Sequence, residues 1–436
     1  MDTTRLLEQM FSPGNLNAAT KQVKRNKGCG GVDRLTITAT LEKLRQLDNG
    51  QQLRQSLLDG SYQPSPVLGV EIPKPKGGVR QLGIPTVQDR IVQQAMAQLL
   101  TQLYEPKFSK SSFGFRPRRS AHHALSKASE YIREGRGYVV DIDLEKYFDT
   151  VNHDRLMYRL SQDIADKRVL KLIRKYLQSG LMRNGVIERR QRGTPQGGPL
   201  SPLLSNIVLD ELDKELERRG HKFCRYADDC QIYVGSEAAA QRVKTSVTEF
   251  LEQTLKLRVN REKSAATRVS ERSYLGHRFN DDGVIGISDD AMHQMKKRVR
   301  QVTKRNRGRT FPAIIKELST YLRGWQNYFK LGLRPSSMSH LDSWIRRRLR
   351  CYRLKQKKRK YSIAMWLISL GVAKPNAWKV AGSDKGWWKL SRTPQVNQAL
   401  PNKRLEELGL YSLLEGYETL KIYSEPPYAI HACTVV

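Results

Sequence analysis

Apolar residues recur every three or four positions through the last third of the chain. Two of these series comprise Met292, Met295, Val299 and Val302, and Ile314, Leu318, Leu322, Trp325 and Phe329. A third comprises Leu341, Ile345 and Leu349. Because this spacing gathers apolar side chains on one side of a helix, the pattern predicts a helical unit with a shared core.

Two β-rich stretches upstream carry acidic residues at or near their ends. Residues 138–142 favour a strand, which Asp141 or Asp143 would end. In "RYADDCQIYV" (225–234) the ADD segment lies between two apolar runs and predicts a tight hairpin. Paired strands would bring Asp143 and Asp228 to one sheet edge, where carboxylates are suitable Mg²⁺ ligands. Aspartate is also common in ordinary turns, and the dipeptide alone favours that simpler interpretation.

Two glycine-rich segments adjoin predicted elements. "GTPQGGPLSPLLSNIVLDELDKEL" (193–216) reads as a turn running into a helix, and Gly197 and Gly198 would let a flat base or sugar approach the backbone. In "KPKGGVR", two strands joined by the glycines would bring Lys74 and Arg80 near one triphosphate. Taken alone, KGG indicates only a turn.

The chain is strongly basic, and its positive charge is concentrated in the predicted helical unit. Its 436 residues include 77 Lys+Arg and 43 Asp+Glu, a formal net charge of +34. Residues 291–360 hold 22 basic residues and only two acids, Glu317 and Asp342. Such a surplus favours a polyanionic partner, with nucleic acid ahead of an anionic membrane surface.

The densest basic run is "RRRLRCYRLKQKKRK" (346–360), with ten basic residues and no acid. A charge run is usually a solvated helix face, but here no acid is present for pairing along the helix. We therefore favour a surface that binds a phosphate backbone. With the apolar stripe facing the core, Arg346, Arg350 and Arg353 are expected to point outward at phosphates.

Other sequence features indicate a domain boundary and the cellular compartment. A Gly- and Asp-rich segment at 280–290 predicts a domain boundary. The five cysteines form no C-x-x-C pair, which argues against a zinc or disulfide framework and indicates a reducing compartment. The apolar stretches are too short to span a bilayer, and the first residues lack the apolar core of a signal peptide. These features predict a cytoplasmic protein without a membrane partner.

Several motifs occur in a fixed order, namely "PKPKGGVRQLGIPT", "SFGFRPRRSAHHAL", "VVDIDLEKYFD", "GTPQGGPLSP", "YADD", "LKLRVNREK" and "YLGHRF". This set resembles the reverse transcriptase of bacterial group II introns. "YLRGWQNYF" resembles the thumb or maturase segment of that family, and "NKGCGGVD" resembles its N-terminal extension. The resemblance covers nearly the whole chain and points to the compact class C lineage.

The resemblance implies an α+β fold, a right-hand polymerase whose fingers and palm carry an antiparallel sheet, followed by an all-α thumb and maturase domain. Residues 1–70 would form the N-terminal extension and the start of the fingers, 71–287 the fingers and palm, and 288–436 the thumb, maturase domain and tail. The final "EPPYAIHACTVV" has too few Cys and His residues for the zinc-dependent endonuclease region of many relatives. Primers are then expected from elsewhere, such as replication forks.

The resemblance also assigns a catalytic site. Asp143, Asp228 and Asp229 would hold two Mg²⁺ ions, with Asp141 as the competing but more structural choice. Lys263 would protonate the leaving pyrophosphate, although a single lysine is commonly just solvated.

Further residues match positions that contact substrates in the family. The matches are Lys74 and Arg80 for the triphosphate, Gln196 for the nucleotide pocket, and Tyr274, Leu275 and Gly276 for the primer grip. Phe148 would lie under the sugar and reject a 2′-OH, with a core aromatic as the alternative role and Tyr147 as the alternative gate. Arg116 would either position the template or fingers or serve as an ordinary structural arginine.

The implied function is RNA-directed DNA synthesis together with binding of a group II intron RNA, which promotes splicing and mobility. The implied partners are the intron RNA, an RNA template, a DNA primer, target DNA and dNTPs, in a bacterial, nucleoid-associated setting. Two alternatives remain open. One is an RNA-binding maturase without polymerase activity, and the other is a relative domesticated for DNA repair or phage defence.

Overall fold

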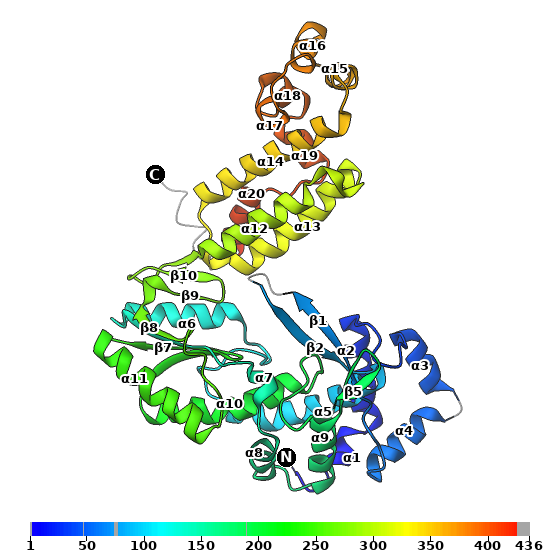
Figure 1. Cartoon of the computed structure of the whole chain (residues 1–436), viewed down its shortest axis with the longest axis vertical. Coiled ribbons are helices and arrows are strands. Elements are labelled where there is room, and N and C mark those ends of the chain that lie inside the picture. The colour runs from blue at the N-terminus through cyan, green and yellow to red at the C-terminus, as the bar shows by residue number, and fades with distance from the viewer. Residues whose placement is uncertain (1, 47, 74–76, 189, 425–436) are drawn as a thin grey trace, which may run out of the picture. The chain divides into compact units, whose positions relative to one another are not determined.

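Figure 1 shows the computed structural model, which describes residues 2–46, 48–73, 77–188 and 190–424. The chain divides into two compact units. The sheet unit comprises Met1–Arg272 and Asp281–Gly283, and the helical unit comprises Ser273–Asn280 and Val284–Val436. The functional boundaries expected after residues 70 and 287 stay predictions.

The sheet unit is a mixture of helices and short strands. Its helices are α1 (Leu6–Met10), α2 (Pro13–Asn26), α3 (Ile37–Arg45), α4 (Asn49–Leu58), α5 (Val87–Tyr104), α6 (Ala121–Arg133), α7 (Tyr147–Thr150), α8 (His153–Ser161), α9 (Lys167–Gln178), α10 (Ser201–Arg218) and α11 (Glu237–Glu249). Its strands are β1 (Val67–Pro73), β2 (Val79–Ile84), β3 (Tyr138–Ile142), β4 (Leu181–Arg183), β5 (Val186–Glu188), β6 (Lys222–Tyr226), β7 (Asp229–Val234) and β8 (Ala265–Arg268).

Side-chain caps set the first residue of several helices in this unit. An oxygen of the preceding residue accepts a hydrogen bond from an otherwise unpaired amide of the first turn. The capping residues are Thr36, Thr86, Ser120, Asn152, Asp166 and Ser236. Ser, Thr, Asn and Asp are favoured at this position because their short side chains reach the amide.

The central sheet of the sheet unit has the strand order β6-β7-β3-β8, and its neighbouring strands are antiparallel. Val139 and Val140 of β3 and Ile232 of β7 are buried, as expected for β-branched residues in a covered sheet. Helices α6, α10 and α11 contact the sheet. The apolar stripe of α10 is buried in the same core, which confirms the helix predicted after the glycine-rich turn.

A second sheet has the strand order β2-β1-β4-β5. Strands β1 and β2 are antiparallel, with Pro73 opposite Val79. Gly77 and Gly78 between them have φ values of +96° and +77°, which glycine adopts without steric cost. The predicted pair of strands around the KGG segment is therefore confirmed, whereas Lys74 lies outside the described residues.

The helical unit begins with a small antiparallel sheet of β9 (Ser273–Tyr274), β10 (His277–Phe279) and β11 (Ile285–Ile287). Its helices are α12 (Asp289–Val302), α13 (Phe311–Phe329), α14 (Pro335–Lys357), α15 (Lys360–Ser369), α16 (Lys374–Ala381), α17 (Trp387–Leu390), α18 (Pro394–Ala399), α19 (Asn402–Glu407) and α20 (Leu413–Ser424). The three predicted apolar series lie on α12, α13 and α14 and pack in a second hydrophobic core. Within the described residues, none of the helices combines the length and apolarity needed to cross a bilayer.

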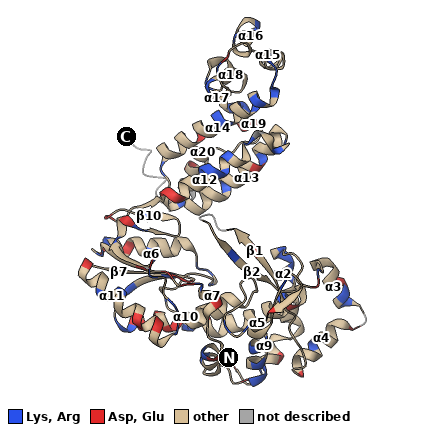
Figure 2. Ribbon diagram, viewed as in Figure 1, with Lys and Arg blue, Asp and Glu red and all other residues tan. Residues whose placement is uncertain are grey.

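One of the two acids in the basic stretch serves the fold. The buried Asp342 carboxylate accepts hydrogen bonds from the amides of Leu413 and Leu414 and from the Ser412 hydroxyl, each at 3.0 Å. Asp342 therefore holds the start of α20 and is not available to neutralise surface cations. Figure 2 shows basic residues along α12 and α14, where acidic residues are sparse.

Candidate active site

The ends of β3 and β7 bring acidic residues together in the sheet unit. The strands pair in a register that places Ile142 opposite Cys230. Asp143 follows Ile142 and Asp229 precedes Cys230, so both lie at the same end of the antiparallel pair. Asp228 lies in the turn that joins β6 to β7. The predicted hairpin, and the prediction that an acid ends β3, are confirmed.

The carboxylates of this strand end influence one another. The pKa of Asp229 rises to about 6 because protein atoms crowd its carboxyl group and because Asp228, Asp141 and Asp143 add negative charge nearby. The guanidinium of Arg80 opposes the rise. Asp229 is nevertheless open to solvent. The acids and Arg80 therefore share one electrostatic environment, which a bound cation would relieve.

Asp143 is fixed through its backbone. Its amide donates to the Ser264 hydroxyl at 3.0 Å, and its carbonyl accepts from the Asn260 amide at 2.8 Å. The same segment carries Lys263, whose Nζ lies 4.0 Å from Oδ2 of Asp143. The Lys263 side chain is 67% exposed, so this attraction is weak and leaves the ammonium able to reach a substrate.

Asp141 has partners of its own within the sheet. Gln231 Nε2 donates to its Oδ1 at 3.4 Å, and Arg272 Nε lies 4.0 Å from its Oδ2. Burial raises the pKa of Asp141, although Gln231 and Arg272 oppose the rise. These contacts favour a structural role for Asp141.

A buried arginine holds the acidic turn. Arg225 of β6 is fully buried, and its Nε and Nη2 bind the two oxygens of the buried Asp213 at 2.7 and 2.5 Å. Nη1 also donates to Asn206 Oδ1 at 3.0 Å and to the carbonyl of Ala227, in the turn, at 2.9 Å, while Nη2 donates to Ser112 Oγ at 2.9 Å. Burial alone would lower the pKa of Arg225, but Asp213 outweighs it and raises the pKa above its ordinary value. The guanidinium therefore stays charged.

Arg225 and Asp213 were not predicted from the sequence. One signal was available, because Arg225 follows Phe223 and Cys224 in an apolar strand, and a buried charge needs a partner. The identity of that partner was not readable, since Asp213 lies on α10 rather than on the strand.

The turn itself has an unusual backbone. Ala227 has a φ of +57°, a left-handed conformation that costs about 1–3 kcal/mol for a residue other than glycine. Gly114 passes so close that a Cβ there would lie 2.2 Å from the Ala227 nitrogen. The Gly114 carbonyl accepts from Asn206 Nδ2 at 2.9 Å, and Asn206 also binds Arg225. Contacts from two other segments thus maintain the turn.

The residues expected at the nucleotide lie on β2 and on the loop before α10. Arg80 is exposed on β2. The carbonyl of Gln196 accepts from the amide of Gly83, on the same strand, at 2.7 Å. Gly197 has a φ of +132°, and a Cβ there would lie 2.6 Å from the Gly83 carbonyl oxygen. The loop that carries Gln196 is therefore held against β2.

Two neighbouring aromatics on α7 differ in accessibility. Tyr147 is buried, and its hydroxyl donates to the Ser205 carbonyl at 2.9 Å. Phe148 is half-buried and meets Tyr147 edge to face with ring centroids 5.4 Å apart. The contacts of Tyr147 favour a core role, which leaves Phe148 as the better candidate for the sugar gate.

Arg116 is enclosed by protein groups. The side chain is 3% exposed and pairs with Glu105 at 2.7 Å. It also donates to the carbonyls of Ser109 and Ser112 and lies over the Phe108 ring, 5.3 Å from its centroid. These contacts favour the structural alternative for this arginine.

The expected primer grip belongs to the helical unit. Leu275 and Gly276 form the turn between β9 and β10, with φ values of +50° and +75°. The Leu275 carbonyl accepts from the Tyr328 hydroxyl at 3.1 Å, and a Cβ on Gly276 would lie 3.3 Å from the Phe329 ring. Tyr274 is buried. Primer contact by this turn stays a prediction.

One arginine of α14 does not point outward, contrary to expectation. Arg350 is buried, with Nε donating to the Leu400 carbonyl at 2.9 Å and Nη2 to Asn402 Oδ1 at 3.0 Å. The side chain of Arg346 is 16% exposed, and Arg353 is half-buried over the Phe311 ring. The prediction was wrong for Arg350 because later segments of the chain cover this side of the helix.

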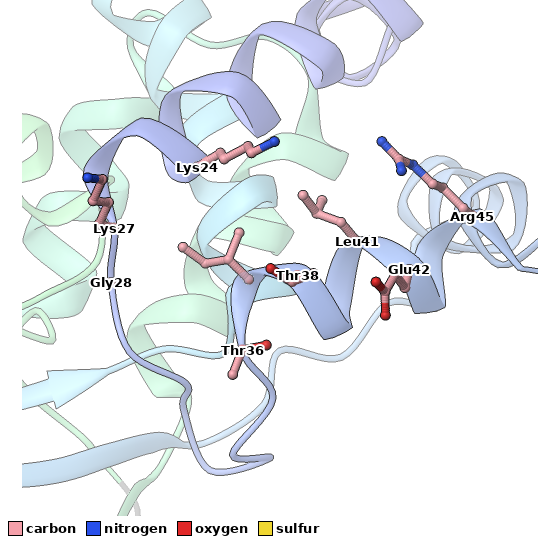
Figure 3. Close-up of a pocket in the computed structure, with 9 residues that line it drawn as sticks. Lys24, Lys27, Gly28, Thr36, Thr38, Leu41, Glu42 and Arg45 are labelled. Atoms are coloured by element: carbon pink, nitrogen blue, oxygen red, sulfur yellow. The ribbon is translucent and has the colours of Figure 1, made fainter.

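A pocket of about 430 Å³ lies beside α2 and α3 in the sheet unit. Lys24, Lys27 and Arg45 line it together with one acid, Glu42. Figure 3 shows the side chains of Lys24 and Arg45 extending toward one another. Leu41 supplies part of its apolar wall. The pocket is basic, but none of the acidic residues of the strand end lines it.

Comparison with known proteins identifies two matching families. A family model for reverse transcriptase (RNA-dependent DNA polymerase) matches residues 72–279, and one for the group II intron maturase-specific domain matches residues 292–367. The chain is 36% identical to Protein YkfC of Escherichia coli (strain K12) over 316 residues, which cover 63% of this chain and 82% of YkfC. It is 31% identical over 343 residues to the Group II intron-encoded protein LtrA of Lactococcus lactis subsp. cremoris, covering 63% of this chain. This match spans 56% of the length of LtrA.

Proposed function

The chain belongs to the reverse transcriptases and maturases encoded by group II introns, and from this premise we propose how its residues serve the two activities. The sheet unit binds an RNA template, a DNA primer and a dNTP for DNA synthesis. Basic residues of the helical unit bind the intron RNA, and target DNA supplies the site of insertion. The observation that carries the proposal is the placement of Asp143, Asp228 and Asp229 at one end of β3 and β7.

In this proposal the three aspartates hold two Mg²⁺ ions. Bound Mg²⁺ would stabilise the attacking and leaving oxygens of a phosphoryl transfer. Within the described part of the chain, no three Asp, Glu, His or Cys side chains are grouped closely enough to hold an ion by themselves. Asp143, Asp228 and Asp229 would therefore hold the ions together with waters and the phosphates of a bound dNTP, since Mg²⁺ is usually bound through one or two carboxylates plus substrate phosphates.

The remaining residues act on the nucleotide. Arg80, with Lys74, binds the triphosphate and orients its α-phosphate toward the primer 3′-OH. Lys263 donates a proton to the pyrophosphate as it leaves, since the exposed ammonium lies on the segment that fixes Asp143. Gln196 borders the base, and Phe148 excludes a 2′-OH.

A maturase that lacks polymerase activity is the less favoured alternative. Such a protein would have no need for the acidic strand end, for Arg80 nearby or for the buried Arg225 that holds the turn. Their presence together supports an active polymerase. Domestication for DNA repair or phage defence would leave the same catalytic residues and concerns only which primers and templates are used.

Replacement of one aspartate tests the proposal. Asp228→Asn keeps the size of the side chain but removes its charge, and should reduce primer extension in Mg²⁺ by at least about a thousandfold, since a lost metal ligand costs several kcal/mol of transition-state stabilisation. RNA affinity should stay nearly intact. Asp154→Asn is a matched control, because this exposed aspartate on α8 lies outside the acidic strand end. Processive extension by Asp228→Asn would overturn the assignment.

Sugar selection has a separate test. Phe148→Ala should narrow the ratio of kcat/KM for dNTPs over rNTPs by at least about tenfold, because the discrimination is steric. Tyr147→Phe removes only the hydroxyl bonded to Ser205 and should leave this ratio unchanged. An unchanged ratio in Phe148→Ala would return Phe148 to the core.

A further inference from the structure

An exposed aromatic face lies in the helical unit, on α15 and α16. It consists of Tyr361, Met365 and Trp378, which are 64%, 44% and 40% exposed. Tyr361 and Met365 are four residues apart and share one side of α15. The Tyr361 and Trp378 rings are neighbours, with centroids 6.1 Å apart and an interplanar angle of 57°. Single exposed apolar residues need no explanation, whereas exposed apolar side chains gathered on one face form a candidate binding surface.

The chain segment that carries this face is strongly basic. Residues 358–392 contain eight Lys and Arg residues and one acid, Asp384. All eight are exposed, namely Lys358, Arg359, Lys360, Lys374, Lys379, Lys385, Lys389 and Arg392. Asp384 lies 4.0 Å from Lys360 and is itself fully exposed, so it neutralises little of this charge. A polyanion is therefore the partner whose charge would match this segment.

We infer that the aromatic face binds an unpaired segment of RNA, with bases stacked on Tyr361 and Trp378 and phosphates against exposed lysines of the same segment, such as Lys360 and Lys379 next to the two rings in the sequence. The inference rests on the proposed RNA-binding function and specifies a surface that extends past residue 367, the end of the maturase-domain match. Flat rings combined with dispersed cations suit unpaired nucleotides, because bases inside a duplex present their edges rather than their faces.

A second exposed tryptophan, Trp388, has an environment that differs from that of Trp378. Trp388 is 38% exposed, but the Arg347 guanidinium lies 3.9 Å from its ring centroid and donates to its carbonyl at 3.0 Å. One face of that ring is already covered by a cation. The neighbour of the Trp378 ring is instead another aromatic ring, that of Tyr361. We therefore place the stacking site at Tyr361 and Trp378.

Photocrosslinking of the full chain tests the inference directly. The probe is a 12-nucleotide single-stranded RNA carrying 5-iodouridine, added with excess unlabelled primer–template duplex to occupy the polymerase site. Crosslinks are expected in the peptides that contain Tyr361 or Trp378. Crosslinks confined to other peptides would overturn the inference while leaving the proposed function in place. Failure of the chain to bind any RNA would overturn both.

Affinity measurements separate stacking from charge. Under the same competition, Tyr361→Ala with Trp378→Ala should weaken binding of the single-stranded RNA by roughly tenfold or more, while Tyr361→Phe with Trp378→Phe should retain most of it. Tyr158→Ala is the matched control, since Tyr158 is 70% exposed on α8 in the sheet unit. Circular dichroism checks the fold of each variant.

Two other ligands serve as competing outcomes. A single-stranded DNA of the same sequence that binds more tightly than the RNA, and loses that affinity in the alanine double variant, would overturn the assignment to RNA. Binding to anionic phospholipid vesicles that is lost in the double variant, with RNA binding unchanged, would instead assign the face to a membrane. Equal RNA affinity in the alanine double variant and the parent chain would also overturn the inference.

Discussion

Arg225 of the sheet unit and Arg350 of the helical unit are both buried, and they are held in different ways. In the sheet unit, Arg225 meets a carboxylate, Asp213, through two hydrogen bonds. In the helical unit, Arg350 donates to two uncharged groups, the Leu400 carbonyl and the Asn402 side chain. The pKa values follow this contrast. Asp213 raises the pKa of Arg225, whereas burial, reinforced by Arg346, lowers that of Arg350.

The difference indicates which of the two arginines is linked to the proposed catalytic site. Arg225 also reaches the Ala227 carbonyl, so its charged pair is joined to the turn that presents Asp228. Arg350 joins α14 to the segment at residues 400–402 and serves packing between helices. A buried ion pair is a costly way to gain stability, because both ions lose their hydration. We therefore expect Arg225 to be a positioning residue and Arg350 to be a structural one.

The largest effect is expected from Arg225→Met. This change leaves Asp213 buried without its cation, which should lower the free energy of unfolding of the sheet unit by about 3–5 kcal/mol. Denaturant unfolding followed by circular dichroism measures the loss. A cost below about 1 kcal/mol would mean that the pair is not buried as described.

A double variant separates stability from positioning. Arg225→Met with Asp213→Leu replaces the ion pair by apolar groups and should recover most of the stability. Primer extension should remain impaired, and its apparent Mg²⁺ requirement should rise, because the turn has lost the bond to Ala227. Recovery of extension together with stability would make Arg225 structural and remove the contrast with Arg350.

A smaller effect is expected from Arg350→Met. The Leu400 carbonyl loses a donor, but no buried ion is left behind, so the cost should be about 1–3 kcal/mol. The measurement is again denaturant unfolding, with Arg359→Met, an exposed site, as the control. A loss equal to that of Arg225→Met would show that charge pairing is not what distinguishes the two arginines.

The smallest effect is expected from Arg346→Gln with Arg353→Gln. Both side chains are partly covered, so the slope of log K for RNA against log salt should fall by about one unit or less. Lys358→Gln with Arg359→Gln is the comparison, because both residues are exposed, and should lower the slope by about one to two units. The reverse order would mean that the covered side of α14 opens when RNA binds.

Local sequence patterns were sufficient to predict much of the sheet unit near its acids. Residues 138–142 form β3 as expected, and the ADD segment forms the predicted turn. These predictions succeeded because strand preference, alternation and turn chemistry are properties of neighbouring residues. The roles of the residues rest on the family resemblance and remain to be tested.

The environment of the arginines was not predictable in the same way. Arg350 was expected at the surface because it lies in an acid-free basic run, yet residues 400–402 cover it. Arg225 was overlooked because its partner lies on α10. In both cases the deciding contact joins elements that are distant in the sequence, and one chain without tertiary information does not reveal which segment supplies it.

The close approach of Gly114 to the Ala227 turn has a consequence for sequence variation among related proteins. Any side chain at position 114 would collide with the backbone of the turn, since even a Cβ would lie 2.2 Å from a main-chain nitrogen. The two positions are 113 residues apart, yet they can change only together. Homologues that replace this glycine should therefore also carry a turn of different length or composition at the position of Ala227, before the residues that correspond to Asp228 and Asp229. Chimaeras joined at a point between the two segments should be functional only when both parents have the same combination of residue 114 and turn.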